Sequence, residues 1–317
     1  MVEKTYQTEN IKSLVQGTPT HSLFLFCLLL HTMSAVETIT LLLTQSNLVQ
    51  GTKNRFRLNL PSGGVRLTLN DTIALQSSNI IYSWPNITAA NGNNLFRYVI
   101  NGTSFDVLIS DGFYSIADMN SFLQNVMYAR GHYLVKADGT LWYPISLRTN
   151  PTFYAVQFDL EPIPATLPVG WSNPSSVLYN TLLPASPATT PQLNIVGNGM
   201  QTIFGIAAGT YPVAPSTTLV SVLSSAVPQV TPVQSIVMTC NLLANRVTTP
   251  NNVLYSFTPM DVAYGSNIYI QPWVTHVSVC PSTYQFVQLE LFDQSLKPLY
   301  LQDPNVCVSL ILQLAHQ

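Results

Sequence analysis

FVQLELFDQSLKPLYLQDPNVCVSLIL, residues 286–312, places two apolar runs on either side of a connection rich in turn residues. Both runs are short and rich in Val, Leu, Ile and Phe, which is typical of β-strands. The connection should link two strands rather than hold a metal ion, because its residues are turn formers and match no metal-ligand pattern. These turn formers are Asp293, Pro298, Asp303 and Pro304.

Similar runs recur along the rest of the chain, and Pro, Gly and Asn break them at points where turns are expected. The strands predicted in the first half are 54–61, 72–84, 95–100, 104–110, 132–137, 140–147 and 153–162. Those predicted in the second half are 235–244, 252–259, 266–274, 275–279, 284–293 and 305–315. No repeat of solenoid length accompanies them, so the pattern favours an all-β domain.

One helix is predicted inside this β pattern, within the stretch 105–147. Ser115 is a candidate N-cap, Asp118 supplies the acidic partner of a capping box, and Gly131 is a candidate terminator. Apolar residues between them recur at helical spacing. They are Ile116, Met119, Phe122, Leu123, Val126 and Met127. A single amphipathic helix in a β protein needs a sheet to cover, so it should lie against one face or end of the sheets.

Residues 161–233 are rich in Pro, Ser and Thr and are predicted to form long surface loops. Proline lacks a backbone N–H, so the stretches 161–192 and 207–232 are not expected to form central strands. Their aromatic residues, among them Trp171 and Tyr211, argue against disorder.

Charge is scarce: 8% of the 317 residues are charged, against roughly 25% in an average soluble domain. A surface with little charge resists self-association weakly, which favours a protein whose surface is covered by neighbouring molecules. The alternative is a secreted or cell-surface β protein. A formal net charge of -2 gives no sign of a nucleic-acid-binding surface.

Half of the twelve basic residues lie near the N-terminus, at Lys4, Lys12, Lys53, Arg55, Arg57 and Arg66. One interpretation is a basic arm that touches nucleic acid or an acidic neighbour. We favour a strand edge protected by Lys and Arg, because these charges form no dense patch.

Residues that could carry catalysis are few and scattered. Asp106, Asp111, Asp118 and Asp138 surround the predicted helix, where paired carboxylates could hydrolyse glycosides, but local turn signals favour turn and cap roles. No nucleotide-binding, serine-hydrolase or zinc-protease motif is present. The histidines, which are His21, His31, His132, His276 and His316, follow no ligand spacing. We therefore predict no catalytic, cofactor-binding or metal-binding residue, and no enzyme.

The four cysteines form no zinc pattern, and those at 240, 280 and 307 fall in strand-like apolar runs. They are predicted to be small buried thiols in a reducing compartment, as is usual for cytosolic folding. The fourth cysteine is Cys27, near the N-terminus. Glycosylation motifs begin at Asn70, Asn86 and Asn101, and they matter only if the protein is secreted.

The N-terminal region contains an apolar run of eight residues, Leu23–Leu30. A membrane span needs about twenty residues, so membrane contact is not expected. The run has the length of a signal-peptide core, but the sequence after it is a poor cleavage site. The first 32 residues are either an arm or an upstream extension of the gene, with Met33 as an alternative start.

Several phrases together resemble a known group of proteins. They are "TIALQSSNIIYSWPNIT", "SFDVLISDGFYSIADMNSFLQ", "NPTFYAVQFDLEPIP", "TIFGIAAGTYP", "NVLYSFTPMDVAYGSNIYIQP" and "FVQLELFDQSLKPLYLQDPNVCVSLIL". From about Glu37 to Leu314 the chain is similar to capsid proteins of polinton-like viruses, virophages and related double-stranded DNA viruses. In that group the major capsid protein has two jelly rolls, and the smaller vertex protein, the penton, has one with an inserted domain. The length here suits one roll plus an insertion.

The resemblance implies an all-β viral jelly-roll sandwich with an inserted β-rich subdomain that carries the helix. The expected division is an N-terminal arm or extension 1–36, a jelly roll 37–94 and 234–317, and an insertion 95–233 made of a helix and hairpin region 95–160 and Pro-rich loops 161–233. The expected function is a minor capsid protein that forms pentamers at the vertices of an icosahedral virion assembled inside the host cell. The expected partners are further copies of the chain, the major capsid protein, and a vertex spike or host receptor.

Two other functions stay open. One is a major capsid or cement protein of the same virion, and the other is a secreted lectin-like or adhesin β-sandwich.

Overall fold

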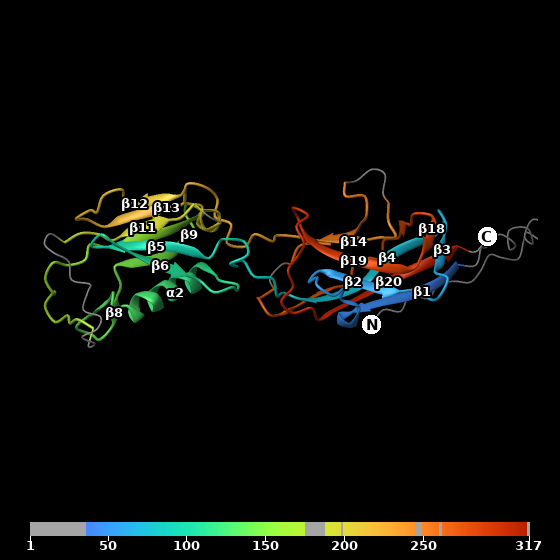
Figure 1. The fold of residues 1–317 in the computed structure, drawn as a ribbon, viewed down its shortest axis with the longest axis horizontal. Coiled ribbons are helices and arrows are strands. Elements are labelled where there is room, and N and C mark those ends of the chain that lie inside the picture. Colours follow the sequence, from blue (N-terminus) through green and yellow to red (C-terminus); the bar gives the residue numbers. More distant parts are fainter. Residues whose placement is uncertain (1–35, 175–187, 198, 245–248, 260–261, 316–317) are drawn as a thin grey trace, which may run out of the picture.

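The structure is a computed structural model that describes residues 36–174, 188–197, 199–244, 249–259 and 262–315. Figure 1 shows two β-rich bodies along the longest axis of the molecule. One body is built from strands near the two ends of the described chain, and the other is built from its middle.

The first body contains two main sheets whose neighbouring strands are all antiparallel. The larger sheet consists, in spatial order, of β1 (Val36–Thr44), β20 (Val306–Ala315), β4 (Thr72–Ile81) and β16 (Asn267–Ile270), with β17 (Val277–Ser278) also paired to β4. The other sheet consists of β2 (Arg55–Asn59), β19 (Phe286–Asp293), β14 (Ile236–Cys240) and β15 (Val253–Phe257). The remaining elements are the short 3₁₀ helix η1 (Gln45–Asn47) and the paired strands β3 (Val65–Leu67) and β18 (Ser282–Tyr284).

This strand order confirms the predicted jelly roll. Counted along the chain, the eight main strands fall in the order first, eighth, third, sixth in one sheet and second, seventh, fourth, fifth in the other. The first strand therefore lies beside the last, and successive strands cross between two antiparallel sheets, which is the connectivity of a jelly roll. We call these strands the jelly-roll body.

The core of the jelly-roll body lies between its two sheets and is mainly aliphatic. Along β20 the alternate residues Val306, Val308, Leu310 and Leu312 are buried. They belong to one cluster with the buried residues of β19, which are Val287, Leu289 and Leu291. The period of two in the sequence thus directs one face of each strand into the sandwich.

The second body, which we call the insertion body, is formed between the end of β4 and the start of β14. One sheet is β12 (Gly209–Tyr211), β11 (Gln192–Ile195), β5 (Leu95–Ile100) and β6 (Thr103–Leu108), and another is β13 (Val220–Leu223), β10 (Ala155–Leu160) and β9 (Ile145–Asn150). A small hairpin pairs β7 (Leu134–Val135) with β8 (Leu141–Trp142), and two helices are α2 (Ile116–Ala129) and α3 (Met200–Phe204). These elements enclose a second hydrophobic core.

Helix α2 is the predicted helix, and its ends are as expected. The Ser115 side chain accepts a hydrogen bond from the Asp118 N–H, and the Asp118 carboxylate accepts one from the Ser115 N–H, which completes the capping box. Gly131 has a φ of 71°, in the left-handed region, and ends the helix. The apolar face of α2 is buried in the second core, and its Asn120 accepts a hydrogen bond from the Leu147 N–H of β9. The helix therefore covers a sheet, as predicted.

The prediction that residues 161–233 are loops is wrong in part. This region contains β11, α3, β12 and β13. Strand β11 is even an interior strand, paired on both sides, although it begins directly after Pro191. Strands β12 and β13 lie at sheet edges, where nearby prolines remove no interior hydrogen bond. Such four-residue runs are too short to stand out between prolines in the sequence.

Several further elements were missed, among them the short strands β3 and β18. Strand β1 lies in a run for which the sequence predicts no strand, and β1 is held in place by β20 from the other end of the chain. Helix α3 has only five residues and is bounded by Gly199 and Gly205, so it shows no helical period. The fold therefore contains a second, short helix beside the one that was predicted.

Candidate assembly surfaces

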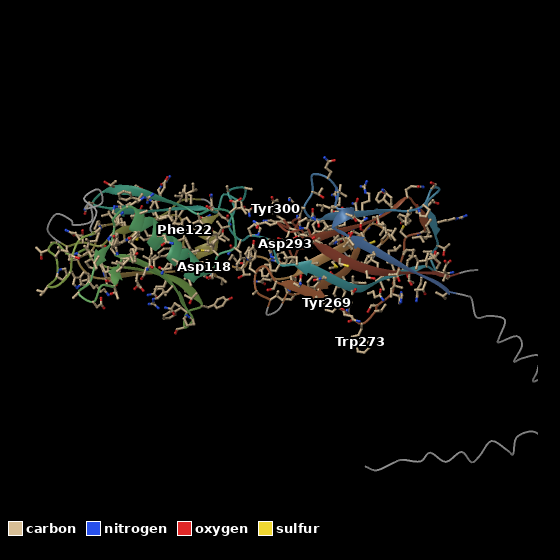
Figure 2. The ribbon with its side chains drawn as sticks, turned by 90° about the horizontal axis from the view of Figure 1, so that it is seen from below. Asp118, Phe122, Tyr269, Trp273, Asp293 and Tyr300 are labelled. Carbon is tan, nitrogen blue, oxygen red and sulfur yellow. The ribbon has the colours of Figure 1, made fainter. Side chains whose placement is uncertain are left out.

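The edge of the larger jelly-roll sheet at β16 carries large exposed aromatic side chains. Tyr269 is 65% exposed and Trp273 is 96% exposed, and Figure 2 shows both on the same side of the jelly-roll body, with Trp273 protruding from it. After β16 the chain leaves β4 and pairs with it again only at β17. Pro272 lies in the intervening segment and offers no N–H, so this segment projects side chains instead of continuing the sheet. We call Tyr269, Trp273 and Val274 the aromatic knob.

The sequence contained a signal for the aromatic knob that was not recognised. In SNIYIQPWV, residues 266–274, Ile268 points into the core and is buried. Tyr269 is the next residue and points outward, and Trp273 follows after the end of the strand. Aromatic residues at outward positions of a strand suggest a binding surface. The sequence alone did not show that this strand lies at a sheet edge.

The opposite edge of the same sheet is β1, which pairs with β20 alone among the described strands. It contains no Lys, Arg or Pro, which often protect an edge strand, and its charged residue, Glu37, lies next to the first residue of the strand. Its exposed side chains include Thr38, Thr40 and Leu42, and Leu42 is 51% exposed. We call these three residues the β1 edge. A nine-residue edge with so little protection is suited to contact with another molecule.

The edge of the other sheet at β2 is different, because it carries arginines. Arg55 forms an ion pair with Glu290, with Nε and Oε1 3.0 Å apart, and Arg57 donates to the Gln288 amide oxygen and lies over the Phe286 ring. The interpretation of these basic residues as strand-edge protection is thus supported at Arg55 and Arg57. Lys4 and Lys12, which belonged to the same prediction, lie outside the described residues.

The two bodies meet at an aromatic cluster. Phe113, which precedes α2, stacks on Tyr264 with ring centroids 5.0 Å apart and an interplanar angle of 11°, and it also packs on Tyr82 of the jelly-roll body. Tyr82 in turn lies 4.4 Å from Trp84, measured between ring centroids. These contacts fix one body against the other through uncharged side chains.

A cavity of about 680 Å³ lies beside this junction. It is lined from the insertion body by Ile116, Tyr154 and Val156, from the connecting segment by Val230 and Val233, and from the end of β15 by Pro259. No charged side chain belongs to its described lining. The described lining therefore offers apolar contact together with neutral hydrogen-bonding groups, among them the side chains of Tyr154 and Gln229.

The acidic residues near α2 all have structural partners. Asp118 caps the helix, Asp138 accepts hydrogen bonds from Thr140, and Asp106 forms an ion pair with Arg97. Asp111 accepts a hydrogen bond from the Ala89 N–H. The hydrogen bonds from Ser115 and Thr140 lower the pKa values of Asp118 and Asp138, the opposite of what a general acid requires. Asp111, Asp118 and Asp138 therefore serve the turn and cap roles that the sequence predicted, whereas for Asp106 the prediction is wrong, because it lies within strand β6 and forms an ion pair.

His132 is the buried histidine of the insertion body. Its Nδ1 lies 2.8 Å from the Tyr98 hydroxyl, and burial, with a smaller effect of the nearby Arg130, lowers its pKa from 6.5 to about 4. His276 lies at the surface, hydrogen-bonded to Thr72. The described residues bring no group of three or more metal-ligating side chains together. His21, His31 and His316 lie outside the described residues.

The prediction that the cysteines are buried holds for Cys240 alone among the described ones. Burial raises the pKa of the Cys240 thiol to about 12, whereas Cys280 is half-buried and Cys307 is exposed. Cys307 lies between the buried residues Val306 and Val308 of β20, so the strand alternation directs it outward. All three thiols are free. Cys27 lies outside the described residues.

The glycosylation motifs differ in accessibility. Asn86 is buried, and its amide group donates to the backbone oxygens of Tyr114 and Val230, so the folded protein offers no room for a glycan there. Asn70 and Asn101 are exposed. None of the described helices is both long and apolar enough to cross a membrane.

Comparison with known proteins found similar solved structures. The chain resembles the mavirus penton protein, with 10% sequence identity, a TM-score of 0.41, and coverage of 88% of this chain and 98% of that chain. It also resembles a chain of the Sputnik virophage structure solved by cryo-EM, with 13% identity, a TM-score of 0.36, and the same coverage. No protein-family model and no curated protein sequence matches the chain.

Proposed function

We propose that this chain is a structural protein of a viral capsid and that it occupies the vertices of an icosahedral shell as a pentamer. The observation that carries the proposal is the strand order: a complete eight-stranded jelly roll with a separate β body inserted between its third and fourth strands. The arrangement suits a roll that forms the shell and an insertion that projects from it.

The surface chemistry supports assembly. Both edges of the larger sheet lack arginine and lysine, so burying them against another molecule leaves no cation without a partner. Exposed aromatic side chains of the kind found at Tyr269 and Trp273 are typical anchors of protein interfaces. No catalytic role is proposed, since the candidate acids serve turns, caps and an ion pair.

We also propose the division of the chain into an N-terminal arm or extension 1–36, a jelly roll 37–94 and 234–317, and an insertion 95–233. The separate hydrophobic cores support this division. In the virion, the jelly roll would contact its own copies and the major capsid protein. The insertion would be available to a vertex spike or a host receptor. Assembly inside the host cell agrees with the free thiols of Cys240, Cys280 and Cys307.

The test is the number of copies in the purified protein, measured by native mass spectrometry and by negative-stain imaging. The proposal expects closed rings of five. Trimers would favour the alternative of a major capsid protein, and a monomer at high concentration would overturn the assembly role altogether. Co-expression with the major capsid protein of the same virus should then place the rings at vertices of the assembled shells.

A secreted lectin-like or adhesin sandwich remains the second candidate. Glycans at Asn70 or Asn101 and disulfides between the cysteines would support it. The buried amide of Asn86 and the free thiols speak against it. Mass analysis of the intact protein from its natural host decides this point.

A further inference from the structure

We propose that the aromatic knob of one copy packs against the β1 edge of a second copy of this chain, and that this contact closes the ring. The inference rests on the proposed function, because it names the surfaces by which the copies join. It concerns Tyr269, Trp273 and Val274 on one side and Thr38, Thr40 and Leu42 on the other.

The first argument is topological. The sheet order is β1-β20-β4-β16, so the knob and the β1 edge lie at opposite ends of one sheet. A contact between two different surfaces is heterologous, and repeated heterologous contacts form a closed ring when the rotation between copies permits. Each isolated copy leaves one knob and one β1 edge exposed, whereas a ring leaves neither exposed. A second copy is therefore the partner that covers both surfaces at once.

The second argument concerns the chemistry of the two surfaces. The Tyr269 hydroxyl donates to the Gln271 side chain at 3.1 Å, so burying its ring leaves no hydroxyl unpaired. On the outward row Leu42 is flanked by Thr40, whose side chain is small and uncharged. Large aromatic anchors that enter an uncharged surface carry most of the affinity of many interfaces.

The third argument excludes the neighbouring edge. At β2 the approach of a second copy would bury the guanidinium of Arg57, which already donates to Gln288 and lies over the Phe286 ring. Burying a charge without a new partner is costly. Continuation of the sheet from β16 is also disfavoured, because Pro272 and the detached segment after it interrupt the edge. At β16, side-chain packing by the knob is therefore favoured over continuation of the sheet.

Three substitutions test the contact: Trp273→Ser and Tyr269→Ser remove the knob, and Leu42→Lys places a charge on the β1 edge. Each should weaken ring assembly by at least about 30-fold, measured as the concentration at which rings dissociate. Trp273→Phe should restore most of the assembly. Phe153→Ser is the matched control, since Phe153 is 69% exposed but lies on the insertion body, and it should assemble as the wild type does. Unchanged thermal unfolding temperatures show that the variants fold.

A cross-link tests the pairing directly. In a full-length background with Cys27→Ser and Cys307→Ser, the pair Trp273→Cys and Thr40→Cys should form disulfides between copies and give a ladder that ends at the ring. Either cysteine alone should give none.

A dimer from the Trp273→Cys variant alone would overturn the inference in favour of contact between two knobs. Wild-type rings that persist in the Trp273→Ser and Leu42→Lys variants would overturn it while leaving the proposed function standing. A monomeric wild type would overturn both.

Discussion

The jelly-roll body and the insertion body are both β-rich, but their strands find partners at very different distances along the chain. In the jelly-roll body, Val36 pairs with Ala315 and Arg55 pairs with Glu290. In the insertion body every strand pair joins residues that lie between the end of β4 and the start of β14. The insertion can therefore form from one continuous segment, whereas the jelly roll needs both ends of the chain.

The two cores differ as well. The jelly-roll core is mainly aliphatic, while the insertion core contains a cluster of three phenylalanines and a buried histidine. Phe96, Phe158 and Phe204 contact one another edge to face, with ring centroids 5.1 to 6.1 Å apart. Because the cores are separate, a single substitution in one core should act on that body and spare the other.

The largest effect is expected for Phe158→Ala. Phe158 is fully buried at the centre of the phenylalanine cluster, and its truncation should destabilise the insertion body by about 3–5 kcal/mol. The counterpart is Leu289→Ala in β19, which should destabilise the jelly-roll body by about 2–5 kcal/mol. Differential scanning calorimetry should show two transitions, each lowered by one variant. If both variants lower a single shared transition, the two bodies do not unfold independently.

A smaller effect, which depends on pH, is expected from His132. Its pKa is about 4 in the folded protein and 6.5 for an ordinary histidine, so the unfolded chain binds more protons between these values. The histidine's contribution to stability is therefore complete above pH 6.5 and is lost as the pH falls toward 4. From pH 7 to pH 5, the free energy of unfolding of the insertion body should fall by about 2 kcal/mol.

The measurement is the pH dependence of the insertion body's unfolding free energy in wild type and in His132→Gln. Gln cannot take up a proton, so the unfolding free energy of the variant should not fall between pH 7 and 5. At pH 7 the variant should be less stable than the wild type. An equal fall in both proteins would assign the pH dependence to another group and show that folding does not lower the pKa of His132.

The parts of the fold that were predicted correctly are those fixed by neighbours in the sequence. The capping box of α2 needs only Ser115 and Asp118, three residues apart, and the turn after β19 needs only the Asp293 side chain, which accepts hydrogen bonds from the N–H groups of Ser295 and Lys297. The inward rows of β19 and β20 follow from the alternation of apolar residues. The jelly-roll class came from resemblance rather than from these local patterns.

The parts that were missed depend on distant partners. β1 becomes a strand because β20 pairs with it over its full length, and β11 becomes an interior strand because β5 and β12 lie on either side of it. The aromatic knob was missed for the same reason: a strand is an edge only when the whole sheet is known. Cys307 is different, because the alternation of β20 already directed it outward.

The smallest effect is expected at the N-terminus of α2, where the sequence was most informative. Ser115→Ala removes the hydroxyl that accepts from the Asp118 N–H and should destabilise the insertion body by about 1 kcal/mol. Ser121→Ala, on the exposed side of the same helix, removes a hydroxyl bonded to the Ala117 carbonyl and should change the stability by less than about 0.5 kcal/mol. Calorimetry of the two variants compares them under the same conditions.

Because the capping box lies entirely within the insertion body, the transition of the jelly-roll body should stay in place for both variants. A shift of that transition with Ser115→Ala would mean that the contacts of Phe113 with Tyr82 and Tyr264, two residues before the cap, transmit the loss from one body to the other.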